Sequence, residues 1–330
     1  MLFASERYYH LESCDFLNQE RTAAVFLGGF LTGDKLSPLD GSAIDQNKQR
    51  AYLKAYSEHA ERALLNIYQE YQQVQALQIL TGEVVTCPSS DFSYQDEMYR
   101  KRNDTTGTGA GVASGQMIKK ATCELLEKNE LMLLWYAQCG RRLLLADQIK
   151  EQASKLGLNT DLLYIFVCQN LCNRPTVIVA VANDRRLLSS GIALSDDFDT
   201  SLQLALEEAR LLQLANSLEN PTAVLNQINE QTHQAVVNHL QHLNATLEVY
   251  QPVSAPPQGF TLASFITDLR VHLLNQGLGN RPATIKCVSN QLLNYLPRHH
   301  NMAISQDLLI LEVYRITTEQ WQTVADCMLL

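Results

Sequence analysis

The pattern that organises this chain begins with Gly41-Ser42-Ala43-Ile44-Asp45 and runs into a helical segment that ends Lys54-Ala55-Tyr56-Ser57-Glu58-His59-Ala60-Glu61-Arg62. A second copy begins with Gly111-Val112-Ala113-Ser114-Gly115 and ends Ala121-Thr122-Cys123-Glu124-Leu125-Leu126-Glu127-Lys128. A third begins with Gly191-Ile192-Ala193-Leu194-Ser195-Asp196 and ends Ala205-Leu206-Glu207-Glu208-Ala209-Arg210-Leu211. Each copy joins a Gly-x-Ala turn to a helix with an alanine three residues before a glutamate. The repetition predicts an α/β fold with a mixed sheet, in which three helices surround one polar cavity.

The copies differ in their internal spacing. Seventeen positions separate the first glycine from the glutamate in the first and third copies, but thirteen separate Gly111 from Glu124. Because an α-helix has ~3.6 residues per turn, the second copy is expected to be short by about one turn. The nearest polar residues in this shortened segment are Gln116 and Lys120.

Two of the helical segments carry glutamates three residues apart, Glu58 with Glu61 and Glu124 with Glu127. Such residues share a helix face, where like charges repel by roughly 0.2–0.5 kcal/mol per pair. A solvated face would tolerate the repulsion, but the second helix is apolar around its glutamates. Mg2+ removes the conflict because it takes carboxylate oxygens and usually keeps water and phosphate oxygens as its other ligands. The pattern therefore favours a magnesium–nucleotide site, with a solvated face as the alternative.

These segments also resemble the signatures of the YcaO family. The run Ser57-Glu58-His59-Ala60-Glu61-Arg62 is similar to the SxxExxER signature, and the run from Glu124 to Trp135 is similar to ExxERDAFxLxW. The helix through Glu208 resembles the third signature, ALxEAxQ. The resemblance extends in order from about residue 35 to 215, with a looser echo over 281–286. It implies a single YcaO-like domain over residues 1–330, with repeated strand and helix units around a nucleotide pocket and a possible large loop at 251–259.

The resemblance implies ATP and Mg2+ as cofactors and names the residues that hold them. The magnesium ligands would be Glu58, Glu61, Glu124, Glu127 and Glu208. The nucleotide would be bound by the same glutamates together with Lys54, Ser57 and Gln116. Arg62 and Lys128 would be catalytic, because phosphoryl transfer needs positive charge in a fixed position. Simple i,i+4 salt bridges from Lys54 to Glu58 and from Glu58 to Arg62 are the alternative.

Family members activate peptide backbone amides by phosphorylation. The resemblance thus implies a cyclodehydratase that converts Cys, Ser or Thr of a ribosomal precursor peptide to azolines, as in thiazole- or oxazole-modified bacteriocins. Its implied partners are the precursor peptide, a leader-peptide-binding E1-like (ThiF-like) protein and a flavin dehydrogenase, with a homodimer also open. Two alternatives remain: a catalytically impaired scaffold or regulatory subunit, and a thioamide- or amidine-forming relative. The first is favoured by Lys128 where arginine is usual and by Leu211 where glutamine is common.

Composition excludes several other classes of protein. The chain has 330 residues, a net charge of -9 and a pI near 5.4, which argues against a general nucleic-acid binder. No apolar run approaches the roughly 18 residues needed to span a bilayer, and no signal peptide is recognisable. The eight cysteines form neither a disulfide framework nor a zinc-spaced set, which favours reduced thiols in the cytoplasm.

The remaining segments predict further elements. Residues 23–30 are expected to form a buried strand, 77–87 a strand interrupted by a Thr81-Gly82 turn, and 162–183 a hairpin. Residues 221–247 read as a polar surface helix, and its three histidines do not have metal-site spacing. A helix over 262–278 and a strand over 283–288 are expected to follow.

Overall fold

The computed structural model describes residues 23–27, 31–32, 35–36, 41–67, 73–92, 104–158, 161–217, 224–244, 247–249, 259–274 and 283–329. The chain divides into two compact units. The first includes Arg21–Leu125 and Ile266–Leu296, and the second includes Leu126–Phe265 and Pro297–Leu330. The single domain expected over residues 1–330 stays a prediction. The loop expected at 251–259 lies almost wholly outside the described residues.

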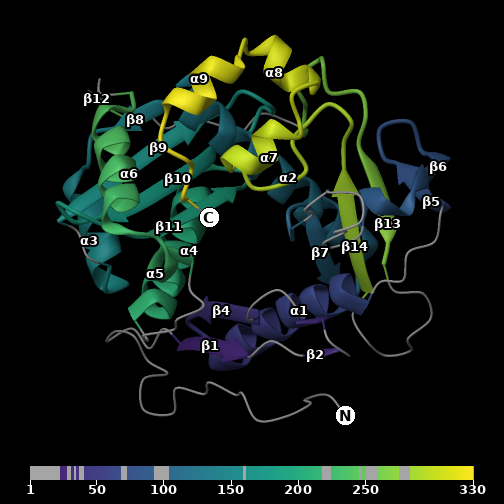
Figure 1. Ribbon diagram of the computed structural model, residues 1–330. Coiled ribbons are helices and arrows are strands. Elements are labelled where there is room, and N and C mark those ends of the chain that lie inside the picture. Colours follow the sequence, from purple (N-terminus) through teal and green to yellow (C-terminus); the bar gives the residue numbers. More distant parts are fainter. Residues whose placement is uncertain are drawn as a thin grey trace. The chain divides into compact units, whose positions relative to one another are not determined.

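The first unit is built on an antiparallel sheet (Figure 1). In sheet order its strands are β6 (Glu83–Pro88), β5 (Gln73–Gln78), β13 (Arg270–Leu273), β14 (Ala283–Val288) and β7 (Thr108–Gly111). Separate antiparallel pairs are formed by β1 (Ala23–Leu27) with β4 (Gly41–Asp45) and by β2 (Leu31–Thr32) with β3 (Lys35–Leu36). Helix α1 (Lys48–Ile67) packs on β4 and also contacts β7 and β14. A short 3-10 turn, η1 (Ser89–Asp91), follows β6.

The second unit has its own sheet, in the order β11 (Leu187–Leu194), β10 (Thr176–Ala182), β9 (Leu162–Cys168), β8 (Arg141–Leu143) and β12 (Leu247–Glu248). All neighbours are antiparallel except β12 and β8. Helix α4 (Phe198–Ser217) lies along β11 and β10 (Figure 1). The smaller helices are α3 (Asp147–Lys155), α5 (Val224–Gln227), α6 (Glu230–His242), α7 (His299–Ala303), α8 (Leu309–Val313) and α9 (Thr318–Thr323).

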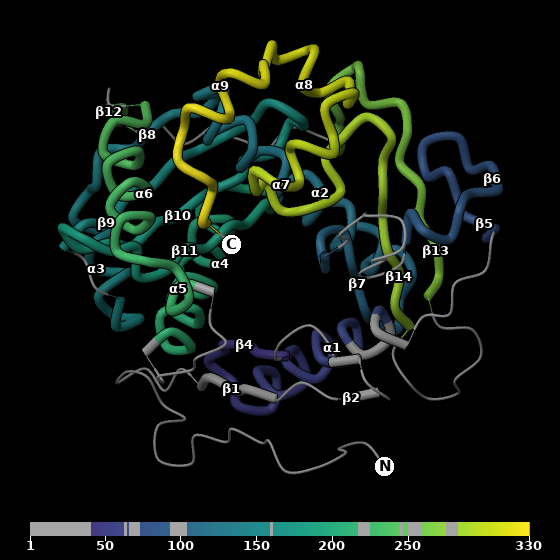
Figure 2. The backbone as a smooth tube through the Cα atoms, in the orientation of Figure 1, coloured from purple at the N-terminus to yellow at the C-terminus, as the bar shows by residue number. Residues whose placement is uncertain are grey.

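Helix α2 (Ser114–Ala137) contains the boundary between the units, which falls after Leu125. Figure 2 traces it as one continuous helix. Its later turns are apolar on every side, and every side chain from Leu131 to Trp135 is fully buried. A helix that is hydrophobic all round needs cover on every face. Part of this cover comes from the C-terminal segment, where the Trp135 indole donates to the Ala325 carbonyl at 2.7 Å.

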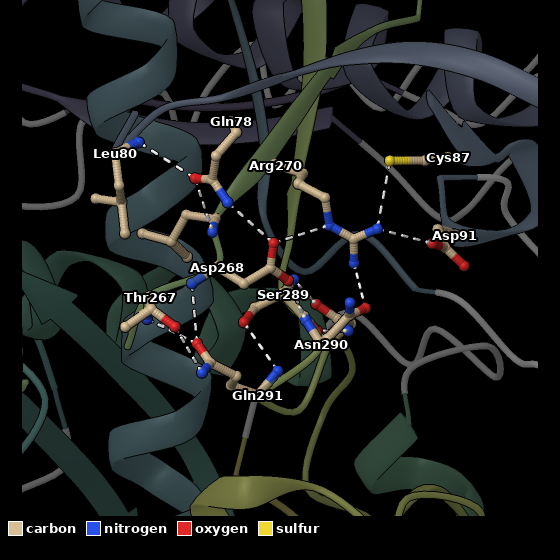
Figure 3. Close-up of polar contacts among 12 residues, drawn as sticks. Gln78, Leu80, Cys87, Asp91, Thr267, Asp268, Arg270, Ser289, Asn290 and Gln291 are labelled. Carbon is tan, nitrogen blue, oxygen red and sulfur yellow. Dashed lines mark hydrogen bonds and ion pairs between the residues drawn. The ribbon is translucent and has the colours of Figure 1, made fainter. Parts of the chain in front are cut away.

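Most expected elements are confirmed, including the strand in 23–30, the strands on either side of Gly82, the hairpin in 162–183 and the strand at 283–288. The helix expected over 262–278 is wrong. Gln291 Oε1 accepts the N–H groups of Thr267 at 2.7 Å and Asp268 at 2.9 Å, and Gln78 Oε1 accepts from Leu269 at 3.3 Å. Side chains thus take the donors that a helix would use internally. Figure 3 shows this cluster, in which Arg270 reaches Asp91 and Cys87, both at 3.3 Å.

The polar helix expected at 221–247 is present as α5 and α6, but it is not a surface helix. One face of α6 is buried, including His233 at 1% exposed. His239 lies edge-on to Trp135, and its Nε2 is 3.1 Å from the Trp135 carbonyl. That distance requires Nε2 to carry the hydrogen, so the neutral ring donates to the carbonyl.

His239 should make stability depend on pH. Burial lowers its pKa below the usual value of 6.5, although the bond to the Trp135 carbonyl opposes this. The unfolded chain therefore binds the proton first as the pH falls, and the free energy of unfolding should decrease from about pH 7 to 5.5. In His239→Phe, which keeps the aromatic contact, urea titrations should show a shallower decrease. Asn238→Ala, on the exposed side of α6, should keep the wild-type slope, and an unchanged slope in His239→Phe would contradict the assignment.

Two repeat glycines lie directly against the helix that follows them. A Cβ built on Gly191 would collide with the Ala205 carbonyl and lie 2.6 Å from the Ala209 nitrogen. A Cβ on Gly41 would likewise collide with the Ala55 carbonyl and lie 2.6 Å from the His59 nitrogen. The alanine three residues before each glutamate is thus the place where strand and helix backbones touch.

We expect Gly191→Ala to lower the free energy of unfolding by roughly 1–3 kcal/mol, the usual cost of overpacking a close contact. Chemical denaturation measures the difference. Gly115→Ala is the matched control, because a Cβ there meets nothing within 4 Å. The control should be neutral or slightly stabilising, since alanine favours a helix over glycine by roughly 0.5–1 kcal/mol. Equal stability of Gly191→Ala and the wild type would show that the strand can move away from α4.

Candidate functional site

The second repeat starts four residues earlier than the sequence pattern indicated. Its strand is Thr108–Gly111, so Gly107 is the counterpart of the other two glycines. Gly107 lies seventeen positions before Glu124, the same spacing as in the other copies. The expected loss of a helical turn is therefore wrong. Gly111-Val112-Ala113 has the same pattern, but it begins at the last residue of the strand, and Val112 is 95% exposed.

In each repeat, the first glutamate accepts the N–H group of the residue that follows the repeat glycine. Glu58 Oε2 accepts from Ser42 at 2.7 Å and Glu124 Oε2 from Thr108 at 3.1 Å. Glu208 Oε2 accepts from Ile192 at 2.5 Å. All three pairs are sixteen residues apart. These are charge-assisted bonds, which are roughly twice as strong as neutral ones.

The second glutamate of each pair binds the strand of the next repeat. Glu61 Oε1 accepts from the Ala110 N–H at 2.7 Å, and Glu127 Oε1 accepts from the Leu194 N–H at 2.7 Å. Strands β7 and β11 therefore each receive two carboxylates, at residues two positions apart. The third helix has Leu211 at the corresponding position and offers no second carboxylate.

The position of these strands explains the arrangement. Strands β7 and β11 are edge strands of their sheets, and among the described residues β4 pairs only with β1. An edge strand leaves a row of N–H groups without a sheet partner, and a buried N–H must still be satisfied. The glutamates supply the missing acceptors, so they belong to the fold as well as to any site.

Glu58 and Glu61 lie in a dense electrostatic cluster of the first unit. Burial raises the pKa of Glu58, and the nearby charge of Glu61 adds to this, against the lowering by Arg62 and the Ser42 amide. Arg62 Nη2 lies 2.6 Å from Glu58 Oε1, which confirms that i,i+4 salt bridge. A further cation beside Glu58 would favour its charged form.

Glu61 is almost fully buried and is bound by Lys120, whose Nζ lies 2.5 Å from Oε1. Burial acts to lower the pKa of Lys120, but the charges of Glu61, Glu124 and Glu58 together raise it. Half of the Lys120 side chain is exposed, so the neighbouring carboxylates are the cause that matters. Lys120 thus binds Glu61 and offsets part of the negative charge that Glu61, Glu124 and Glu58 share.

The other predicted residues are distributed as follows. Glu127, Lys128 and Glu208 belong to the second unit, and Lys128 is 8% exposed. Lys54 binds Asp45 at 2.7 Å, so the expected Lys54–Glu58 salt bridge is wrong: the shorter Asp45 side chain at the end of β4 holds it instead. Ser57 is half-buried on α1, and Gln116 is exposed in the first turn of α2. That all five glutamates meet in one pocket stays a prediction.

The carboxylates fit a shared cation without forming a complete metal cage. Among the described residues, no group of three His, Cys, Asp or Glu side chains is arranged to hold a metal ion. Mg2+ does not need such a cage, because it is commonly held by one or two carboxylates together with phosphates and water. A carboxylate has about four acceptor positions, so the N–H bonds of Glu61 and Glu124 leave room for a metal.

Three important residues were missed in the sequence. Thr108 carries the amide that binds Glu124, and its Oγ1 lies 3.4 Å from Glu61 Oε2; counting seventeen back from Glu124 to Gly107 would have found it. Lys120 is only one of two nearby polar residues in the sequence, and its role depends on the contact with Glu61. Glu130 is fully buried and accepts the N–H groups of Asn170 and Leu171 at 2.6 and 2.7 Å.

Residues 19–277 match the family model of the YcaO cyclodehydratases, which is described as ATP- and Mg2+-binding. This chain belongs to the YcaO family. The family's cofactors are ATP and Mg2+. A comparison with curated protein sequences found no match.

Solved structures share the fold at low identity. The YcaO from Methanopyrus kandleri bound with AMPPCP and Mg2+ is 13% identical with a TM-score of 0.61, over 83% of this chain and 84% of that chain. The E. coli microcin synthetase McbBCD complex with pro-MccB17 bound is 14% identical with a TM-score of 0.65, over 89% of this chain and 92% of that chain. A heterocyclase in complex with substrate and cofactor is 13% identical with a TM-score of 0.59, over 84% of this chain and 48% of that chain. The YcaO chain is thus an α/β protein of this fold.

If the glutamates complete the edge strands, replacing one should lower the stability of the protein even in the absence of nucleotide. Glu208→Leu removes the acceptor for the Ile192 N–H and should cost roughly 1–3 kcal/mol of unfolding free energy. Glu208→Gln keeps an acceptor oxygen and should cost less. Glu151→Leu, at an exposed site on α3, is the control. Equal stability of all three variants in guanidinium titrations would contradict a structural role of Glu208.

Proposed function

We propose that this chain is an ATP-dependent cyclodehydratase that activates backbone amides of a ribosomal precursor peptide and forms azolines from Cys, Ser or Thr. The main support is the cluster in the first unit, in which Glu58, Glu61 and Glu124 share the positive charges of Arg62 and Lys120. Phosphoryl transfer needs chiefly positioned cations and metal-binding carboxylates. The fixed strand amides hold these carboxylates in defined directions before any ligand binds.

Each predicted residue has a task in this proposal. ATP, when bound, supplies the phosphoryl group that turns the amide oxygen into a leaving group. Arg62 and Lys128 supply positive charge toward that group. The proposed Mg2+ ligands are Glu58, Glu61, Glu124, Glu127 and Glu208, and further proposed nucleotide contacts are Lys54, Ser57 and Gln116. Lys128 provides a point charge rather than the planar fork of arginine, so its variants should affect rate more than geometry.

The proposal includes partners and a compartment. The precursor peptide would be delivered by an E1-like leader-binding protein, and a flavin dehydrogenase could oxidise the azoline product. The microcin synthetase McbBCD complex with pro-MccB17 bound supports protein partners and a peptide substrate. All seven cysteines among the described residues are free thiols, which fits a reducing cytoplasm. Among those residues, no helix has the length and apolarity required to cross a membrane.

A scaffold or regulatory subunit is the second candidate. The observation that favours it is that strand amides, Arg62 and Lys120 already bind the repeat glutamates without any ligand. In that case the carboxylates would serve only the fold.

Calorimetry with ATP distinguishes the two candidates. The wild type should bind ATP saturably when Mg2+ is present and much more weakly in EDTA. Glu58→Gln retains an acceptor for the Ser42 amide but loses the charge, and it should raise Kd at least about tenfold, or about 1.4 kcal/mol. Glu151→Gln, exposed on α3, is the control. A folded wild type that binds no ATP at millimolar concentration would favour the scaffold.

A further inference from the structure

Lys286, on β14, is a charged residue in an unusual place. Its side chain is 0% exposed, and lysine is almost never fully buried without a partner. It lies opposite Thr108 in the antiparallel pairing of β14 with β7. Its Nζ donates to the backbone carbonyl of Asp104 at 2.7 Å. The ammonium is therefore placed beneath the turn that leads into β7.

The turn from Asp104 to Thr108 is held from several directions. Asp104 Oδ1 accepts from the Thr106 N–H at 2.8 Å, and Oδ2 accepts from the Leu296 N–H at 2.6 Å. The Thr105 carbonyl accepts from Thr108 Oγ1 at 2.8 Å. The Asp104 side chain therefore joins the turn to the segment that follows β14, while Lys286 joins it to β14 itself.

Gly107 completes the turn. Its carbonyl accepts from the Cys287 N–H at 2.7 Å. Its φ of 78° lies in the left-handed region, and a Cβ there would collide with the Cys287 carbonyl. The turn is thus shaped to lie directly on β14, with one residue of β14 bonded to Gly107 and the preceding one, Lys286, bonded to Asp104.

The turn delivers the groups that orient two of the carboxylates. Immediately after it, the Thr108 N–H binds Glu124 and the Ala110 N–H binds Glu61. Burial lowers the pKa of Lys286 to about 8, and the charges of Asp104 and Glu124 oppose this. A shift of this turn would therefore turn both carboxylates, although Lys286 itself is sealed from solvent and cannot touch a ligand.

We propose that Lys286 and Asp104 are positioning residues of the nucleotide site. The bond from Lys286 to the Asp104 carbonyl and the two bonds of the Asp104 side chain fix the Asp104–Thr108 turn, which in turn fixes the N–H groups that aim Glu61 and Glu124 at Mg2+. The inference rests on the proposed ATP-dependent function, and it adds a requirement from β14, outside the three repeated motifs.

Two variants and two measurements test it. Lys286→Met keeps the length of the side chain and removes its charge, and Asp104→Asn is a milder change in case the first variant does not fold. Both should raise the Kd for Mg2+-ATP about tenfold, and the Mg2+ concentration for half-maximal binding should rise with it. Without nucleotide, hydrogen exchange of residues 106–110 should be faster in both variants. Lys150→Met, exposed on α3, should behave as the wild type.

The outcomes separate the two proposals. Wild-type affinity, Mg2+ dependence and exchange in a folded Lys286→Met or Asp104→Asn would refute the positioning role alone. Absence of ATP binding by the folded wild type would refute the proposed function and, with it, this inference. Faster hydrogen exchange with unchanged Mg2+-ATP affinity would show that Lys286 and Asp104 stabilise only the turn, and this too would overturn the proposal.

Discussion

The structure depends on carboxylates that complete the edges of sheets. Strands β4, β7 and β11 each present N–H groups without a strand partner, and a glutamate sixteen residues later satisfies one of them. Leaving a buried N–H unsatisfied costs roughly 1–3 kcal/mol of folding free energy. Each of these bonds therefore stabilises the fold independently of any catalytic role. In the first and third repeats, the close contact of the glycine with the following helix brings that helix within reach of the strand edge, whereas Gly107 of the second repeat lies against the Cys287 carbonyl.

The same bonds connect one repeat to the next. Within the first unit, Glu61 on α1 accepts a hydrogen bond from β7. Within the second unit, Glu127 on α2 accepts one from β11. In each pair of glutamates three residues apart, the first glutamate thus binds the strand of its own repeat, and the second binds the strand of the following repeat. The like-charge repulsion within each pair is offset by the amides and, in the first unit, by Arg62 and Lys120.

This device also suits a nucleotide site. Catalysis by preorganised electrostatics needs charges that do not move when the ligand arrives. Carboxylates held by rigid strand amides meet that need, and they retain lone pairs for a cation. In the proposed enzyme, fold and chemistry therefore use the same side chains.

The amino-acid sequence by itself determined the repeat, the glutamate pairs and the YcaO family, because helical spacing and Gly–Ala contacts are local and leave a regular pattern. It also showed most strands, through their apolar runs. The register of the second repeat was left open by the sequence, because the Gly-x-Ala pattern favours Gly111 and the seventeen-residue spacing favours Gly107. The pairing of β7 with β14 decides for Gly107. The conformation of 262–274 was decided in the same way, because its N–H groups are taken by Gln78 and Gln291 from distant parts of the chain. Lys120 and Lys286 acquire their roles only when the fold brings them to Glu61 and Asp104, and no local pattern records such long-range pairing.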